Sequence, residues 1–338
     1  MTEHARTAAV SEPRVTVVVV QRERLSPVRR TLGRLLESLT LPHRMVYVDG
    51  GSPRRLAGWL REQADEHGFD LLRVDHHLVP TEARNLGLAH AKTELVVLID
   101  NDVVVEDGWL ERMIECLDET GASAVGPLTC EGEPLGERVH FAGGEVHIEE
   151  DPDNGSRHVK DRMFHAQRPL AKVRDELQRQ PVTLLELHTL LLRRELIDEI
   201  GPFDEELSTR YHLDWCLRVA QAGRTLWFEP SAVVHYVPGP PKDIADAHFY
   251  MLRWSDAWER RSLEHFRAKW DLADDEFFRR RLGRLGWRRQ MTIIDPFCRR
   301  LLPGKLGGAA ARAAKPPERV LNRIITRRHA RARARTHA

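Results

Sequence analysis

The run Leu95-Val96-Val97-Leu98-Ile99-Asp100-Asn101-Asp102 decides the fold class of this chain. Its apolar part is uninterrupted, which is typical of a parallel strand that helices cover on both faces. Two carboxylates, Asp100 and Asp102, follow at the carboxyl end of this strand. Open α/β sheets bind ligands just beyond such ends, and paired carboxylates suit a Mg²⁺ or Mn²⁺ ion that bridges a diphosphate. The alternative is a polar turn, because Asp and Asn are common turn residues.

The segments around this run alternate between strand and helix patterns. Apolar runs of strand length lie at 15–20, 45–48, 71–74 and 94–99. Apolar residues at helical spacing lie at 28–39, 53–67, 81–91 and 109–120. The alternation predicts an α/β fold, with a doubly wound, mostly parallel sheet and right-handed crossovers.

The pattern changes in the second half of the chain. Residues 131–180 are polar, with a strong turn at Asp151-Pro152-Asp153-Asn154-Gly155, and predict an irregular or hairpin-containing insertion. Later patterns predict strands over 182–193, 225–228 and 232–237, and helices over 195–200 and 214–222. We expect a disordered N-terminus (1–14), one α/β domain (15–240) in which a variable insertion (131–180) separates residues 15–130 from 181–240, and a helical C-terminal extension with a basic tail (241–338).

The net charge of +1 conceals a strong asymmetry. Residues 279–338 carry 18 Lys and Arg against two acidic residues, whereas the rest of the chain carries 34 against 49. A basic segment with short amphipathic stretches favours an anionic membrane surface as its partner. The alternative is a solvated arm that lies against the acidic body. Nucleic acid is an unlikely partner, since 309–338 lacks aromatic residues that stack on bases.

No apolar run in the sequence reaches the length of a membrane span. Residues 1–14 lack the basic-then-apolar order of a signal peptide. The four cysteines are widely spaced, which favours reduced thiols. We therefore expect a cytoplasmic protein that can attach to the inner face of the membrane.

The order of several short motifs resembles that of family 2 glycosyltransferases with the GT-A fold. The motifs are Val15-Thr16-Val17-Val18-Val19-Val20, Val46-Tyr47-Val48-Asp49-Gly50-Gly51-Ser52, Ala83-Arg84-Asn85-Leu86-Gly87, Asp100-Asn101-Asp102, Leu191-Leu192-Arg193-Arg194-Glu195, Gly201-Pro202-Phe203-Asp204-Glu205, Asp214-Trp215-Cys216-Leu217-Arg218 and Phe228-Glu229-Pro230-Ser231-Ala232-Val233-Val234-His235. The resemblance covers residues 15–237 and implies a GT-A glycosyltransferase domain over 15–240, with a nucleotide-binding half (15–130) and an acceptor half (181–240). It implies transfer of a sugar, by default from a UDP-sugar, to the hydroxyl of a glycan, a lipid-linked or a small-molecule acceptor. It also implies Mn²⁺ or Mg²⁺ as cofactor, and a role in cell-envelope, polysaccharide or glycolipid synthesis.

The same resemblance implies roles in donor binding. Asp49 ends a strand where a carboxylate can bind a base or a ribose, and Gly50 lets the backbone approach the nucleotide. Arg84 is expected to pair with a phosphate. Asp102 is expected to bind metal, and Asp100 ribose or metal. The alternatives are a turn for Asp49 and a solvated helix charge for Arg84.

The resemblance also implies roles for residues whose surrounding sequence matches the family pattern less closely. His235 stands where relatives have a third metal or phosphate contact, and its imidazole suits Mn²⁺ better than Mg²⁺; the alternative is a structural histidine. Glu186 and His188 could touch the donor sugar or form the outward face of a strand. His212 replaces the Asp that deprotonates the acceptor in many relatives. Histidine can act as a base near neutral pH, so His212 is the predicted base of an inverting transfer, with Asp214 or retaining chemistry as alternatives.

Two other classes of function remain open at this point. A sugar nucleotidyltransferase shares this kind of sheet, but Gln21-Arg22-Glu23-Arg24 stands where a glycine-rich loop would follow the first strand. A non-catalytic sugar- or nucleic-acid-binding protein is the third candidate, and the basic tail is its main support.

Overall fold

The computed structural model describes residues 12–132 and 136–336 of the chain. Of the N-terminal segment predicted to be disordered, residues 1–11 lie outside the described part. The strands are β1 (Val15–Val20), β2 (His43–Gly50), β3 (Asp70–Val74), β4 (Leu95–Asp100), β5 (Val103–Val105), β6 (Ala124–Glu131), β7 (Arg138–Phe141), β8 (Gly144–Glu150), β9 (Arg157–Met163), β10 (Gln180–Val182), β11 (Thr189–Arg193) and β12 (Leu226–Tyr236).

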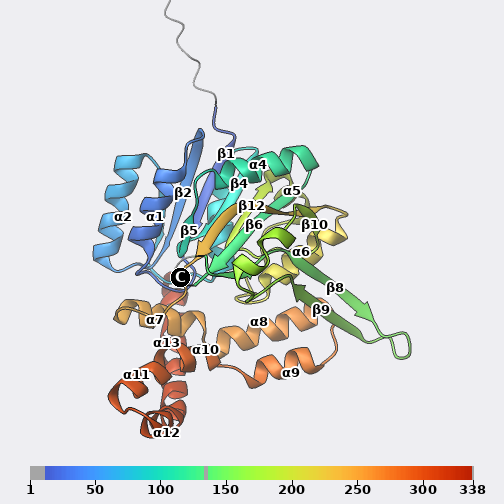
Figure 1. Cartoon of the computed structure of the whole chain (residues 1–338). Helices are drawn as coiled ribbons and strands as arrows, with labels where there is room; N and C mark the ends of the chain where they lie inside the picture. The colour runs from blue at the N-terminus through green and yellow to red at the C-terminus, as the bar shows by residue number, and fades with distance from the viewer. Residues whose placement is uncertain (1–11, 133–135, 337–338) are drawn as a thin grey trace, which may run out of the picture.

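The helices cover the sheet and then continue into a C-terminal cluster (Figure 1). They are α1 (Val28–Ser38), α2 (Arg54–His67), α3 (Pro80–His90), α4 (Trp109–Thr120), α5 (Arg194–Ile200), α6 (Tyr211–Gln221), α7 (Ile244–Arg253), α8 (Asp256–Lys269), α9 (Glu276–Gly283), α10 (Trp287–Arg289), α11 (Asp295–Leu301), α12 (Lys305–Ala313) and α13 (Lys315–Thr336). Short 3-10 helices lie at Leu170–Lys172 and Arg174–Glu176, and a short π-helix lies at Gln290–Ile294.

The apolar runs of the sequence form strands that are buried on both faces. Alternate residues of β1 point to opposite sides, so Val17 joins a core with α1, α2 and α4, whereas Val18 joins a second core with α3, α5 and α6. Helix α3 lies very close to β1, because a Cβ on Gly87 would meet Val18 Cγ1 at 2.2 Å. The two cores form a three-layer arrangement that exposes only the edges of the sheet.

The main sheet has the order β10-β12-β6-β11-β4-β1-β2-β3, with β5 and β7 paired to β12 and β6. Strands β3, β2, β1 and β4 are parallel neighbours, as predicted. Strand β11 runs antiparallel between β4 and β6, so the complete sheet is mixed. Because Val20 pairs in register with Asp100, the carboxyl ends of β1 and β4 meet at one edge.

Two predicted strand boundaries are wrong. The strand predicted over 182–193 is interrupted, because residues 183–188 leave the sheet between β10 and β11. The strands predicted over 225–228 and 232–237 are one strand, β12, with a register shift between Glu229 and Val233. Pro230 lies in this shift, where its missing N–H costs no ladder hydrogen bond.

The insertion after β6 has the predicted hairpin. Strands β8 and β9 pair antiparallel and project from the body (Figure 1). Their turn is closed by Asp151, whose backbone exchanges hydrogen bonds with Ser156 and Gly155 at 2.8 Å. Strand β7 pairs with β6 instead, which brings the insertion next to the edge where β4 ends.

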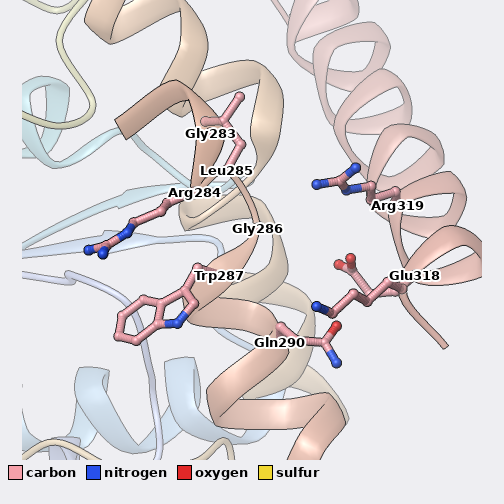
Figure 2. A pocket seen from close by; sticks show the side chains of 9 residues that line it. Gly283, Arg284, Leu285, Gly286, Trp287, Gln290, Glu318 and Arg319 are labelled. Carbon is pink, nitrogen blue, oxygen red and sulfur yellow. The ribbon is translucent and has the colours of Figure 1, made fainter. Parts of the chain in front are cut away.

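The C-terminal helices pack beneath the sheet edge, and α13 runs back toward it (Figure 1). A buried ion pair fastens α13, since Arg289 Nε donates to Glu318 Oε1 at 2.6 Å. Figure 2 shows Glu318 and Arg319 on α13 facing Trp287 and Gln290 across a small cavity of about 160 Å³. No helix in the described residues combines the length and the apolar character that a membrane span needs.

Candidate active site

Asp100 and Asp102 lie at the edge where the sequence places them, and both are buried. Their side chains are 1% and 0% exposed. Neither carboxylate oxygen of Asp102 has a hydrogen bond in the described structure. Burial raises the pKa of Asp102 to about 7. Burying a carboxylate without hydrogen bonds costs folding free energy, unless an opposite charge lies beside it. This position is therefore suited to a cation.

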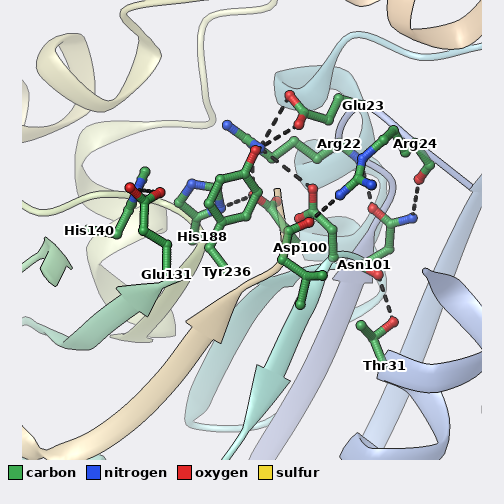
Figure 3. Close-up of polar contacts among 12 residues, drawn as sticks. Arg22, Glu23, Arg24, Thr31, Asp100, Asn101, Glu131, His140, His188 and Tyr236 are labelled. Carbon is green, nitrogen blue, oxygen red and sulfur yellow. Dashed lines mark hydrogen bonds and ion pairs between the residues drawn. The ribbon is translucent and has the colours of Figure 1, made fainter. Parts of the chain in front are cut away.

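Arg22 already brings positive charge to these carboxylates. It extends from the end of β1, with Nε 3.4 Å from Asp100 Oδ2 and Nη1 3.5 Å from Asp102 Oδ2. It also contacts Glu23 and lies over the ring of Tyr236 (Figure 3). Sequence reasoning missed Arg22; the available signal was an arginine directly after a strand that is adjacent to β4.

Arg84 is fully buried and points toward Asp100. Its Nη2 donates to Asp100 Oδ1 at 2.6 Å and to the carbonyl oxygen of Leu187 at 2.7 Å. Its Nη1 donates to the carbonyl oxygen of Pro80 at 3.2 Å. In this arrangement Arg84 orients Asp100. Arg84 is not a solvent-exposed charge on a helix, which was the alternative interpretation of this residue.

Asp49 lies at the end of β2, at the same edge but apart from Asp100. Its Oδ1 accepts from Gln21 Nε2 at 3.0 Å and from the backbone N–H of Ser52 at 3.1 Å, and its Oδ2 pairs with Arg73. The turn that follows needs glycine, because Gly51 has a φ of +74° and a Cβ there would lie 2.9 Å from backbone of His76. Gly50 donates its N–H to Gln21 Oε1 at 3.1 Å.

A cavity of about 220 Å³ joins several of the predicted residues. Its lining includes Asp100, Glu186, His188 and His212. Basic residues from distant parts of the chain complete it: Arg22, Arg210, Arg253 and Arg288. Positive charge gathers here although the body as a whole is acidic, so the cavity is suited to an anionic ligand.

The two base candidates have different surroundings. Burial, together with the positive charge of Arg210, lowers the pKa of His212 to about 3, so its imidazole is neutral. Asp214 is absent from the cavity lining. Its Oδ1 accepts from Trp270 Nε1 at 2.9 Å and pairs with Lys269 at 2.7 Å, and Oδ2 lies 3.2 Å from Arg218 Nε.

The third candidate metal ligand, beside the two carboxylates, is a ring nitrogen of His188. The sequence analysis assigned this histidine to the donor sugar. Ligand atoms of Asp100, Asp102 and His188 all lie within 4.8 Å of one another. His235 is outside that group, and its Nε2 lies 2.9 Å from Glu106 Oε1. Two carboxylates and an imidazole, with Asp102 lacking hydrogen bonds, form a donor set that can hold a divalent cation.

Comparison with known proteins agrees with this architecture. Residues 16–201 match the family model described as glycosyl transferase family 2. The chain is 28% identical over 223 residues to the pre-mycofactocin glycosyltransferase of Mycobacterium tuberculosis, covering 65% of this chain and 42% of that protein. It is 21% identical over 220 residues to glycosyltransferase AglE of Haloferax volcanii, covering 64% of each protein.

The chain therefore spans less than two thirds of the length of these relatives. Among solved structures, GalNAc-T7 with UDP, GalNAc and Mn²⁺ aligns at 15% identity with a TM-score of 0.49, covering 83% of this chain and 58% of that one. The family match spans more than half of the sequence. With a mixed sheet of GT-A type and acidic residues at its carboxyl edge, this protein belongs to glycosyl transferase family 2.

Proposed function

We propose that this protein transfers a sugar from a nucleotide-sugar to an acceptor hydroxyl with the help of a divalent cation. The observation that carries the proposal is the buried Asp100–Asp102 pair, whose Asp100 lines a cavity that also contains a neutral histidine, His212. Family membership supports the same chemistry.

Asp102 and Asp100 are the proposed cation ligands. A bound Mn²⁺ or Mg²⁺ would neutralise charge on the departing nucleoside diphosphate. Arg84 keeps Asp100 in place through its 2.6 Å hydrogen bond. Arg22 supplies a second positive charge at the same carboxylates, which supports binding of an anionic leaving group.

His212 is the proposed general base. The acceptor oxygen attacks the anomeric carbon, the bond from that carbon to the diphosphate oxygen breaks, and the hydroxyl proton passes to His212. The neutral imidazole has a nitrogen lone pair for this proton. Burial and Arg210 lower its pKa to about 3, which makes it a weak base, and the carboxylate of Glu186 opposes that shift. Asp214 is less suited, because Trp270, Lys269 and Arg218 already occupy its oxygens. A direct displacement of this kind inverts the anomeric centre.

Asp49 and Gly50 are the proposed contacts for the nucleoside, since they lie at the same sheet edge as Asp100. Asp49 would exchange its present partner Arg73 for a base or ribose. Glu186 and His188 face the cavity and are proposed to contact the donor sugar. The first donor to test is a UDP-sugar, which rests on the resemblance of the motifs alone.

The acceptor is proposed to be lipid-linked, because an exposed apolar and basic surface lies on α11 and α12. Phe297, Leu301 and Leu306 are 61%, 62% and 67% exposed, next to exposed arginines and a lysine. Each cation near an anionic bilayer contributes about 1 kcal/mol. A small-molecule acceptor is the alternative, since the mycobacterial relative is named for pre-mycofactocin.

Vesicle sedimentation tests the membrane part of the proposal. A variant with Phe297→Ser, Leu301→Ser and Leu306→Ser should no longer pellet with anionic vesicles at low salt. Ile244→Ser is the matched control, because Ile244 is 89% exposed but lies on α7. Equal sedimentation of both variants would exclude this surface as the attachment site.

A product assay tests the reaction itself. Nucleotide-sugars are incubated with the protein, candidate acceptors and Mn²⁺, and the nucleotide product is identified. Release of a nucleoside diphosphate that depends on Mn²⁺ supports glycosyl transfer. A parallel incubation contains a nucleoside triphosphate and a sugar phosphate, and release of pyrophosphate there would indicate a nucleotidyltransferase. Binding without turnover in both incubations would indicate a non-catalytic protein.

A further inference from the structure

A second cluster of metal-binding side chains lies in the same cavity, next to the aspartate pair. Ligand atoms of His140, Glu186 and His188 all lie within 4.8 Å of one another. His140 Nε2 is 3.1 Å from Glu186 Oε2, and His188 Nε2 is 3.7 Å from Glu186 Oε1. His140 comes from β7 in the insertion, whereas the other two come from the segment that leaves the sheet. Asp102 is not part of this group.

Both imidazoles have a carboxylate at the opposite ring nitrogen. His140 Nδ1 lies 2.8 Å from Glu131 Oε2 (Figure 3), and Glu131 also accepts from Gln167 Nε2 at 2.6 Å. His188 Nδ1 lies 3.1 Å from Asp100 Oδ2. Burial opposes the charged form, but the carboxylates of Glu186 and Glu131 raise the pKa of His140 to about 9. A metal ion at His140 Nε2 would therefore replace a proton. By their distances, the Nε2 atoms of His140 and His188 both lie near the carboxylate of Glu186.

Two inner atoms of this cluster have no hydrogen bond in the described structure. Nε2 of His188 and Oε2 of Glu186 are both buried without one, and the His188 side chain is only 2% exposed. Buried polar atoms normally find a partner. A cation between the two Nε2 atoms and the carboxylate would provide one.

We propose that His140, Glu186 and His188 form a site for a transition-metal ion of the Zn²⁺, Co²⁺ or Mn²⁺ class, separate from the oxygen-rich site at Asp100 and Asp102. Two imidazoles and one carboxylate favour such ions over Mg²⁺. Three protein ligands leave coordination positions open, and these positions face the cavity that contains His212.

The position of the site gives the ion a task in the proposed reaction. A hydroxyl bound to the ion would lose its proton more readily, because a cation lowers the pKa of its ligand. His212 lines the same cavity and would receive that proton. This task rests on the proposed function, whereas ion binding itself rests only on the geometry of the three ligands.

Binding of Co²⁺ alone, followed by its visible d–d absorption, tests the site in full-length protein without a polyhistidine tag. We expect His140→Ala and Glu186→Gln each to weaken Co²⁺ binding at least tenfold. Glu131→Gln should weaken it about 10-fold to 100-fold through loss of the outer hydrogen bond. Asp102→Asn should keep the wild-type Co²⁺ spectrum. Thermal unfolding without metal checks that each variant is folded.

His147→Ala is the matched control, because His147 is an exposed histidine in the same insertion and faces Glu149. If His140→Ala and Glu131→Gln bind Co²⁺ as tightly as His147→Ala, no metal site exists at this cluster. If Asp102→Asn abolishes the Co²⁺ spectrum as well, the ion belongs to the aspartate pair and the inference is wrong. Neither outcome depends on turnover, so failure of the proposed function would be seen separately, in the product assay.

Discussion

Arg22 places its Nη1 3.5 Å from Asp102 Oδ2, so a fixed positive charge faces the carboxylate assigned to a cation. Arg22→Met would leave Asp102, Asp100 and Glu23 without this charge. Loss of one partner from a buried ion pair costs about 3–5 kcal/mol, so the melting temperature without metal should fall. Mn²⁺ should then raise the melting temperature of Arg22→Met more than that of the wild type.

Arg24→Met is the control for this experiment, because Arg24 is buried nearby but bonds the carbonyl oxygen of Val237. The result that would contradict this prediction is that Mn²⁺ raises the melting temperature of Arg22→Met no more than that of Arg24→Met. That result would show that the Arg22 guanidinium and the ion do not share these carboxylates.

Asp102→Asn should abolish transfer but leave the protein folded. The charge of the cation ligand is lost, whereas stability changes little, because neither oxygen of Asp102 has a hydrogen bond and the pKa of Asp102 is raised to about 7 by burial. Turnover and thermal unfolding measure the two effects. Near-wild-type turnover of this variant would remove Asp102 from the proposed cation site.

His212 and Asp214 should respond differently to substitution. His212→Gln should lower turnover by about two to four orders of magnitude, the usual contribution of a general base, with little change in donor affinity. Asp214→Asn should mainly lower the free energy of unfolding, because Lys269 and Arg218 lose a buried anion. Steady-state kinetics and urea unfolding of both variants separate the roles. The opposite pattern would move the base to Asp214.

The Arg289–Glu318 pair should control the docking of α13. Glu318→Gln removes one of the two carboxylates that pair with the buried Arg289 guanidinium, and Asp256 remains as the other. The cost should therefore stay below the roughly 3–5 kcal/mol of a buried charge with no partner. Amide hydrogen exchange in α13 should become faster. Asp295→Asn, which breaks the exposed Asp295–Arg299 pair, should change stability by less than about 1 kcal/mol. Equal exchange in both variants would contradict a fastening role for Glu318.

Stability should decrease as the pH falls below about 6.5, the ordinary pKa of a histidine side chain, partly because of His77. Burial lowers the pKa of His77 to about 4 in the folded protein. Between these values the unfolded chain binds a proton that the folded protein does not, so acid favours unfolding. Urea unfolding at pH 7.5 and pH 5 measures the change. His77→Phe, which keeps the stack on Phe249, should show a smaller pH dependence; an unchanged dependence would exclude His77 as its source.

The sequence predicts the first half of the fold well, because buried parallel strands are long apolar runs and their helices have clear amphipathic spacing. It also places Asp100 and Asp102 correctly, since they directly follow such a run. The run of leucines at 184–192 was misleading. Leu184, Leu185 and Leu187 are buried in the core without forming strand, and burial alone cannot distinguish the two.

The sequence did not predict the partners that complete the site. Arg22 and His140 meet Asp100 and Glu186 only through strand order and the return of the insertion, neither of which has a local pattern. Likewise, the surroundings of Asp214 depend on Lys269 and Trp270, from α8 and its end. Sequence spacing therefore cannot predict contacts that come from a distant segment. Arg84, for example, was expected to pair with a phosphate and donates to Asp100 in the structure.

The C-terminal helices form one wall of the cavity that contains His212, because Arg253, Trp254 and Arg288 line it together with residues of the sheet edge. An exchange of residues 241–336 between related enzymes would therefore exchange part of that cavity. Under the proposed function, acceptor selectivity can diverge through this segment while the proposed nucleoside contacts at Asp49 and Gly50 stay unchanged. A chimaera of this kind separates the two specificities in a single protein.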